Sequence, residues 1–353
     1  MNVPPLFTPF KLREVVLRNR VVMSPMMQYS ATDGMAGPWH TPHLGSRAVG
    51  GAALVFAEQT AVSPLGRSTL GDLGLWSDAH IAPLAAIAQF VESQGAVPGI
   101  QLGHSGRKAS IRSPWQPRTP LREEEGGWQP LAPSALPCGK GRPVPHPMSI
   151  PEIAAVIDEF AAAARRAAAA GFKVIEIHGA HGYLPHQFLS PLSNRRDDAY
   201  GGSFNGRSRF VVELITAMRA AWPQELPLAI RLSATDDLPD GWTLEDTLRL
   251  VPLLHEAGVD LFDISLGGIG AAHAYPTSPG ALAPLAAQIR SQAGVPVAVS
   301  WNIGTPELAN EIIAREQADL VFLGRALLRD PYWTLRAADA LDAGSLWPVQ
   351  MKR

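Results

Sequence analysis

The sequence predicts an α/β protein that folds as a (β/α)8 barrel, with an N-terminal hairpin and a long capping insertion after the third strand. Short β-branched or apolar runs alternate with longer helical patterns along the whole chain, which indicates a parallel sheet with right-handed crossovers. Eight such runs can be found. The length of 353 residues exceeds that of a typical single barrel, so a barrel leaves residues over for additions.

The expected strands are runs of four to six mostly apolar residues, as in strands buried on both faces. They cover residues 21–26, 53–57, 97–102, 174–178, 228–232, 261–265, 297–300 and 320–323. Helical patterns cover residues 81–93, 150–169, 207–221, 244–256, 281–293 and 306–315. The alanine run 161–170 is the strongest helix former, and Gly171 ends it. Thr305 before Pro306 is expected to cap the last helix.

Two surplus segments have expected places. Residues 10–20 predict a short hairpin that closes the floor of the barrel. Residues 105–147 are rich in proline, glycine and charge, and a loop of that length usually forms a lid or carries small structure of its own. We therefore expect one domain over 1–353, with a capping insertion at 105–147 and a C-terminal tail at 345–353.

The composition excludes several classes of protein. The net charge is −2, and 30 basic residues are interspersed with 32 acidic ones, which disfavours nucleic acid and anionic membranes as partners. The single cysteine, Cys138, excludes disulfides within the chain, iron–sulfur clusters and zinc–cysteine sites. No segment has the pattern of a signal peptide or a membrane span. These features predict a cytoplasmic protein with no membrane partner.

The end of the fourth expected strand carries the strongest functional signal. Residues 175–183 read Ile-Glu-Ile-His-Gly-Ala-His-Gly-Tyr, and side chains just past strand ends usually do the chemistry of a barrel. His178 and His181 can hold one oxygen atom by hydrogen bonds, and the phenol of Tyr183 can deliver a proton nearby. The two histidines could instead ligate a metal ion, but strong sites add a suitably spaced carboxylate or cysteine. Glu176 shares the face of His178 but lies further down the strand.

The other strand ends add groups that suit a large, planar, phosphorylated cofactor. Gln101 presents a donor and an acceptor together, which matches a pyrimidine edge. Arg231 can stabilise negative charge on a ring, or form a salt bridge inside the barrel mouth. Gly324 lets backbone N–H groups approach a phosphate, or serves packing alone, and Arg325 would add a charge-assisted contact.

Six segments together resemble the old yellow enzyme family, and most closely its bacterial thermophilic-like ene-reductase branch. They are Val-Met-Ser-Pro-Met at 22–26, Gly-Ile-Gln-Leu-Gly-His-Ser-Gly-Arg-Lys at 99–108, His-Gly-Ala-His-Gly-Tyr at 178–183, Phe-Leu-Ser-Pro-Leu-Ser-Asn-Arg at 188–195, Tyr-Gly-Gly-Ser at 200–203 and Gly-Arg-Ala-Leu-Leu-Arg-Asp-Pro at 324–331. The resemblance covers residues 6–353, and the combination of motifs is specific where no single motif is.

The resemblance implies an FMN-dependent NAD(P)H oxidoreductase on a (β/α)8 barrel. The implied FMN contacts are Ser24, Pro25, Met26, Met27, Gln59 through its backbone, Gln101 at the pyrimidine edge, Arg231 beside N1 and C2=O, the variable patch Ser300, Trp301 and Asn302, and Gly324 and Arg325 at the phosphate. On the substrate side, His178 and His181 would hold a carbonyl or nitro oxygen, Tyr183 would be the proton donor, and Tyr29 would contact the substrate.

The activity implied is reduction of activated alkenes such as enones, maleimides or nitroalkenes. NADPH or NADH reduces the flavin, a hydride passes from flavin N5 to the β-carbon, and Tyr183 protonates the α-carbon. Other readings are a barrel reductase or demethylase that feeds electrons to further centres, a non-catalytic flavoprotein redox sensor, and a metal-dependent hydrolase. The lone cysteine disfavours the first, and the presence of His178, His181 and Tyr183 together disfavours the second.

The chain departs from the related branch at two positions. Met27 stands where a cysteine is usual, so we expect an altered flavin potential and a tighter pocket, unless Met27 is an inert core filler. Gln59 stands where small residues are common, and its side chain is expected to point into solvent. The tail resembles one whose arginine, here Arg353, reaches the active site of a neighbouring subunit, which implies a homodimer or homotetramer.

Overall fold

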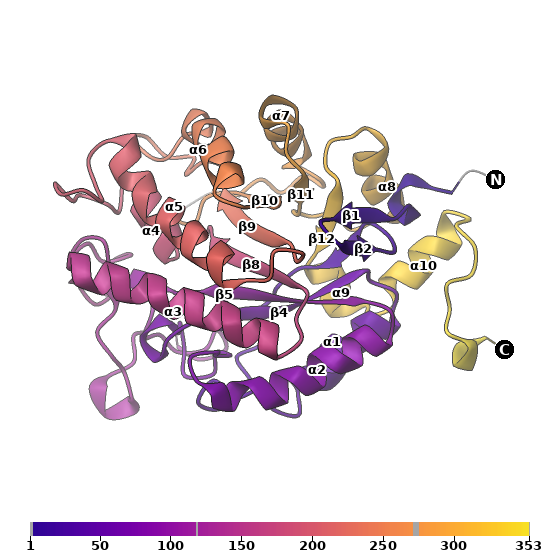
Figure 1. Ribbon diagram of the computed structural model, residues 1–353, viewed down its shortest axis with the longest axis horizontal. Helices are drawn as coiled ribbons and strands as arrows, with labels where there is room; N and C mark the ends of the chain where they lie inside the picture. Colours follow the sequence, from indigo (N-terminus) through magenta and orange to yellow (C-terminus); the bar gives the residue numbers. More distant parts are fainter. Residues whose placement is uncertain (1–2, 118, 271–274, 353) are drawn as a thin grey trace.

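The computed structural model describes residues 3–117, 119–270 and 275–352. At its centre is a closed barrel of eight parallel strands with helices packed around the outside (Figure 1). The strands are β3 (Val21–Met23), β4 (Leu54–Ala61), β5 (Val97–Gly103), β8 (Val174–Gly179), β9 (Leu228–Ser233), β10 (Leu261–Ser265), β11 (Val297–Val299) and β12 (Leu320–Leu323). Pairing of β12 with β3 closes the barrel, so the predicted fold is confirmed. β3 ends earlier than expected and β4 continues further.

Six of the helices match the expected patterns: α2 (Ile81–Ser93), α3 (Ile150–Ala169), α5 (Phe204–Ala221), α6 (Leu244–Glu256), α7 (Ala283–Ala293) and α8 (Pro306–Ala314). Thr305 caps α8 by accepting a hydrogen bond from the backbone N–H of Leu308. Four helices were not predicted: α1 (His40–Val49), α4 (Leu184–Leu189), α9 (Arg325–Arg329) and α10 (Trp333–Ala340). The sequence of α1 hides its helical period because the face it buries includes His40, His43 and Arg47 as well as apolar residues.

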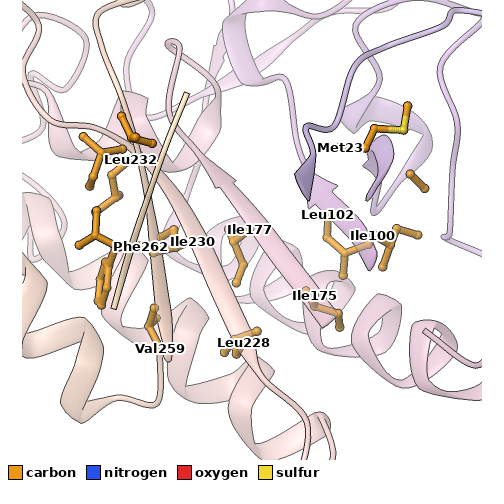
Figure 2. Packing of buried hydrophobic residues seen from close by; sticks show 14 of the residues in the cluster. Met23, Ile100, Leu102, Ile175, Ile177, Leu228, Ile230, Leu232, Val259 and Phe262 are labelled. Carbon is orange, nitrogen blue, oxygen red and sulfur yellow. The ribbon is translucent and has the colours of Figure 1, made fainter. Parts of the chain in front are cut away.

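Strand residues alternate between the barrel interior and the layer under the helices. Figure 2 shows Ile175, Ile177, Leu228 and Ile230 in this outer layer, where they belong to the main hydrophobic cluster. Their neighbours in sequence therefore face inward. This period places Glu176 and His178 of β8 inside the barrel, at and above its middle.

The N-terminal hairpin closes the floor of the barrel, as expected. Strands β1 (Phe10–Leu12) and β2 (Val15–Leu17) pair antiparallel. Leu12 and Leu17 are buried in the inner cluster with Val22, Phe56 and Phe322. Because this end is filled by apolar side chains, polar groups that could do chemistry are confined to the opposite mouth, where the strands end.

The elements in the described residues of the capping insertion are all short. They are the 3-10 turns η4 (Gly106–Lys108) and η5 (Glu123–Glu125) and a two-stranded sheet of β6 (Leu131–Ala132) and β7 (His146–Pro147). The insertion joins the mouth through Lys108, whose Nζ donates to the backbone oxygen of His181 at 2.6 Å. The cap is thus tied directly to the histidine loop.

The C-terminal tail lies at the opposite end of the barrel from the mouth. After α10 it passes Leu346 and Pro348, which lie beside Arg18, Gly51 and Gln94, before the starts of β3, β4 and β5. It ends in the turn η6 (Val349–Met351), and Arg353 lies outside the described residues. None of the helices in the described parts of the chain has the length and apolar character that a membrane crossing requires.

Candidate active site

Five polar side chains from the barrel strands and the segment after β3 lie in one layer at the mouth. Gln101 Nε2 donates to Glu176 Oε1 at 2.7 Å. Arg231 Nη2 donates to Ser24 Oγ at 2.8 Å, and its Nε donates to Asp263. Arg231 therefore forms the salt bridge that was one of its two expected roles. This salt bridge joins β9 to β10 at the mouth.

Burial controls the charge of this layer. It raises the pKa of Glu176 to about 8, and the negative charge of Asp263 adds to this effect while Arg231 opposes it. Burial also raises the pKa of Asp263. The pKa of Arg231 stays high because the two carboxyl groups outweigh its own burial. At neutral pH, Glu176 is thus mainly protonated, while Asp263 accepts a hydrogen bond from the guanidinium of Arg231.

The side chain of Gln59 points into the mouth, so the expectation that it faces solvent is wrong. The register between β4 and β5 shifts between Ala57 and Gln59, and such a bulge turns the following side chain to the other face. Glu58 consequently accepts a hydrogen bond from the backbone N–H of Gln28 at 2.7 Å. Gln59 is 2% exposed, and its Nε2 donates to Ser105 Oγ at 3.3 Å. A bulge of this kind leaves no mark in the sequence pattern.

A cavity of about 800 Å³ opens beside this layer at the ends of β11 and β12. Its lining includes seven of the predicted cofactor residues: Ser24, Met26, Ser300, Trp301, Asn302, Gly324 and Arg325. Pro25 is buried and Met27 partly buried in the same segment. Arg325 Nη2 donates to Asn302 Oδ1 at 3.1 Å, so the structure brings the expected phosphate residues together.

The donors and acceptors of the mouth fit a phosphorylated flavin. Within the described residues, Gln59 Oε1 is buried and has no hydrogen-bond partner, and a buried acceptor of this kind suits a ligand N–H. Gln101 adds a fixed amide, and Arg325 adds a positive charge at the far end of the cavity. The volume lies in the range of cofactor pockets.

His178 and His181 turn one nitrogen each toward the same point. His178 Nε2 and His181 Nδ1 are 3.4 Å apart, and the ring centroids are 5.1 Å apart. Burial lowers the pKa of both imidazoles well below the ordinary value of 6.5, and the charge of Arg231 acts in the same direction. Both rings are therefore neutral. Because His178 Nδ1 accepts the backbone N–H of Ala180 at 3.3 Å, its proton sits on Nε2.

Three contacts from distant segments fix His181. Its backbone has a φ of +55°, in the left-handed region, which costs a non-glycine residue about 1 kcal/mol. Its N–H donates to Ser233 Oγ at 3.0 Å, its oxygen accepts from Lys108, and its Nε2 lies 2.6 Å from Ser265 Oγ. Lys108, Ser233 and Ser265 were not predicted as site residues. Ser233 follows Arg231 by two residues on β9, and Ser265 follows Asp263 by two residues on β10, so both serines face the barrel interior. This alternation could have indicated them.

The ring of Tyr183 packs against the ring of His178. Its ring centroid is 4.5 Å from that of His178, at an interplanar angle of 78°. Burial raises the pKa of Tyr183 to about 12, so the phenol keeps its proton at neutral pH. Its hydroxyl contacts Met27 Sδ at 3.8 Å. Met27 therefore borders the phenol. Tyr29 lines the same cavity as Tyr183.

In the described part of the chain, no group of three or more histidine, cysteine, aspartate or glutamate side chains is placed to hold a metal ion.

Comparisons with known proteins agree with this geometry. Residues 5–343 match the model of the NADH:flavin oxidoreductase / NADH oxidase family. The chain is 43% identical to an NADPH dehydrogenase of Geobacillus thermodenitrificans over 350 residues, covering 99% of this chain and 98% of the relative. It is 42% identical to the NADPH dehydrogenase of Bacillus subtilis, with the same coverage.

Solved structures give the same result. Morphinone reductase superposes with a TM-score of 0.81 at 28% identity, covering 98% of this chain and 91% of that protein. Its complex with tetrahydroNAD superposes with a TM-score of 0.80, also at 28% identity, covering 97% of this chain and 92% of that protein. A complex of 2-naphthoyl-CoA reductase superposes with a TM-score of 0.88 at 25% identity, covering 95% of this chain but only 52% of that protein.

Proposed function

Because this chain belongs to the NADH:flavin oxidoreductase / NADH oxidase family, the old yellow enzymes, and is an NAD(P)H-dependent flavin oxidoreductase, we propose that it reduces carbon–carbon double bonds activated by a carbonyl or nitro group. The flavin in this proposal is FMN. Family membership also argues against a metal-dependent hydrolase and a non-catalytic redox sensor.

The observation that carries this proposal is the pair of neutral imidazoles beside a protonated phenol. Without a ligand, His178 Nε2 donates to His181 Nδ1, 3.4 Å away. Once His181 carries its proton on Nδ1, both neutral rings can donate to one substrate oxygen. Tyr183 stacks edge-on against His178, so its hydroxyl is close to a substrate held there. An oxygen anchor and a proton donor at the mouth of the barrel suit reduction of a polarised alkene by a bound flavin.

The chain's own residues act by orientation and proton transfer. FMN, when bound, supplies the hydride that the β-carbon of the alkene receives. His178 and His181 donate hydrogen bonds to the carbonyl or nitro oxygen and stabilise the negative charge that grows there. Tyr183 donates its phenolic proton to the α-carbon. A phenol with a pKa of about 12 is a sufficient acid for a carbanion-like centre.

The cofactor contacts are proposed from the same layer. Gln101, oriented by Glu176, would present its remaining donor and acceptor to the pyrimidine edge of FMN, and Gln59 would add a side-chain acceptor. Arg231 would lie beside the N1 side of the ring. Gly324 and Arg325, with the backbone of Ser300, Trp301 and Asn302, would hold the phosphate.

We also propose a homodimer or homotetramer in which Arg353 enters the mouth of a neighbouring subunit. The described part of the tail lies at the floor of its own barrel, at the opposite end from its own mouth. Deletion of residues 351–353 should weaken substrate binding while FMN stays bound. Unchanged kinetics would contradict a shared site.

Product analysis tests the proposed reaction. With NADPH and 2-cyclohexenone under anaerobic conditions, the enzyme should form cyclohexanone in a one-to-one ratio with the NADPH consumed. If NADPH were consumed only in the presence of oxygen and no cyclohexanone formed, the enzyme would be an oxidase and the proposed substrate class would be wrong.

A further inference from the structure

A second cavity lies between the substrate residues and the capping insertion. Its volume is about 470 Å³, and Tyr29 and Tyr183 line one side. Lys108, Lys140 and Arg142 of the capping insertion also line it. The cavity therefore adjoins Tyr183, the proposed proton donor.

The charged side chains among the described lining residues of this cavity are all basic. Three basic side chains line it, and no aspartate or glutamate is among its described lining residues. Lys108 uses two of its three N–H donors on the backbone oxygens of His181 and Gly268. Lys140 and Arg142 form no ion pair within the described residues, and Arg142 Nη1 is buried there without a hydrogen-bond partner. A buried donor without an acceptor is costly, so the arrangement suits a ligand that supplies one.

The crowding of positive charge also affects Lys108. Burial lowers its pKa to about 8, and the charges of Arg107 and Arg142 act in the same direction. An anion bound among these side chains would reverse that effect and hold the lysine protonated.

We propose that Lys140 and Arg142, assisted by Lys108, bind a phosphate group of the reduced nicotinamide dinucleotide. This inference rests on the proposed function, in which the dinucleotide and the alkene use the same mouth in turn. If the nicotinamide ring occupies the space beside His178 and Tyr183, the rest of the dinucleotide has to leave through the adjoining cavity. A neutral alkene needs no cations there, whereas a phosphate brings charge and three acceptor oxygens.

The inference can be tested without an alkene. Lys140→Ala, Arg142→Ala and the double variant are compared with Arg122→Ala, which removes an exposed charge of the same insertion that is paired with Glu124 and Glu125. Dissociation constants for NADP⁺ and NAD⁺ are measured by titration calorimetry on the flavin-loaded proteins. The rate of flavin reduction by NADPH and by NADH is followed anaerobically.

Each single change should weaken NADP⁺ binding about tenfold, because it removes one charge-assisted hydrogen bond, and Arg122→Ala should match the wild type. A loss confined to NADP⁺ and NADPH would assign the 2′-phosphate to the subsite, and an equal loss for NAD⁺ and NADH would assign the diphosphate. Unchanged binding of both dinucleotides in the double variant would overturn the inference. A wild type that NADPH reduces but that no alkene reoxidises would overturn only the proposed substrate class.

Discussion

His178 Nε2 and His181 Nδ1 lie 3.4 Å apart, and only one of these two nitrogens can carry the proton between them. The backbone N–H of Ala180 fixes that proton on His178. Without a ligand, His181 therefore accepts at Nδ1 and donates from Nε2 to Ser265 Oγ, 2.6 Å away. To donate to a substrate oxygen, His181 has to carry its proton on Nδ1, and the hydroxyl of Ser265 has to reverse and donate to Nε2.

This relationship predicts that Ser265 positions the proton of His181. Ser265→Ala should weaken binding of a ketone ligand about tenfold, the value of one hydrogen bond, because nothing then stabilises the donating tautomer. Ser265→Thr keeps the hydroxyl and should restore most of the affinity. The dissociation constants can be read from the change in flavin absorbance. If the alanine variant bound as tightly as the wild type, the role of Ser265 would be refuted.

Tyr183→Phe should separate the two halves of the reaction. The hydride step from NADPH needs no proton from Tyr183, so flavin reduction should stay within about twofold of the wild type. Reoxidation by 2-cyclohexenone should slow about 100-fold, the usual contribution of a positioned general acid. Stopped-flow absorbance measures both rates. Equal loss in the two halves would contradict the assignment of Tyr183 as proton donor.

The lack of a hydrogen-bond donor at Met27 should lower the flavin potential relative to that of a protein with cysteine at this position. The thioether lies 3.8 Å from the Tyr183 hydroxyl and donates no hydrogen bond. Met27→Cys adds a donor and should raise the flavin potential by about 30 mV, equivalent to one hydrogen bond over two electrons. Met27→Leu, which keeps the bulk without the sulfur, should leave the potential near that of the wild type. Identical potentials in the wild type and the cysteine variant would exclude tuning at this position.

Neither Tyr183 nor the two imidazoles should add an inflection to the rate of alkene reduction between about pH 6.5 and 9.5, whereas Glu176 and Lys108, with pKa values of about 8, titrate within this window. Tyr183 acts as an acid and has a pKa raised to about 12, so it loses its proton only well above this window. The imidazoles act as neutral donors with lowered pKa values, so they become charged only well below pH 6.5. Single-turnover reoxidation measures this profile directly. An inflection near pH 10 or near pH 6.5 would show that one of these groups titrates as it does in water.

Much of the fold could be predicted from local pattern. The limits of β10 and β12 were predicted to the residue: Asp319 and Gly324 bound the run of β12, while Asp260 precedes β10 and Ser265 is its last residue. The direction of Gln59 could not be predicted, because the bulge in β4 depends on pairing with β5. α1 was missed because its buried face includes imidazole and guanidinium groups as well as apolar side chains.

In the candidate site, too, some residues could be predicted from the sequence and others could not. His178, His181 and Tyr183 lie within six residues, so the sequence brings them together. The groups that hold His181 come from far along the chain: Lys108 lies 73 positions before it and Ser265 lies 84 positions after it. Lys140 and Arg142 lie in a stretch without periodicity, where the sequence does not indicate which way a side chain points. Only the closed barrel and its cap bring these groups to the same mouth.

The most direct test of the account is the visible spectrum of the purified protein under anaerobic conditions. The protein should be yellow, bleach when one equivalent of NADPH is added, and recover its colour when 2-cyclohexenone follows, with recovery slowed at least about tenfold by His178→Ala. If folded protein bound no FMN, or if the reduced protein stayed bleached with every activated alkene supplied, the paired imidazoles would not be the oxygen anchor of an ene-reductase.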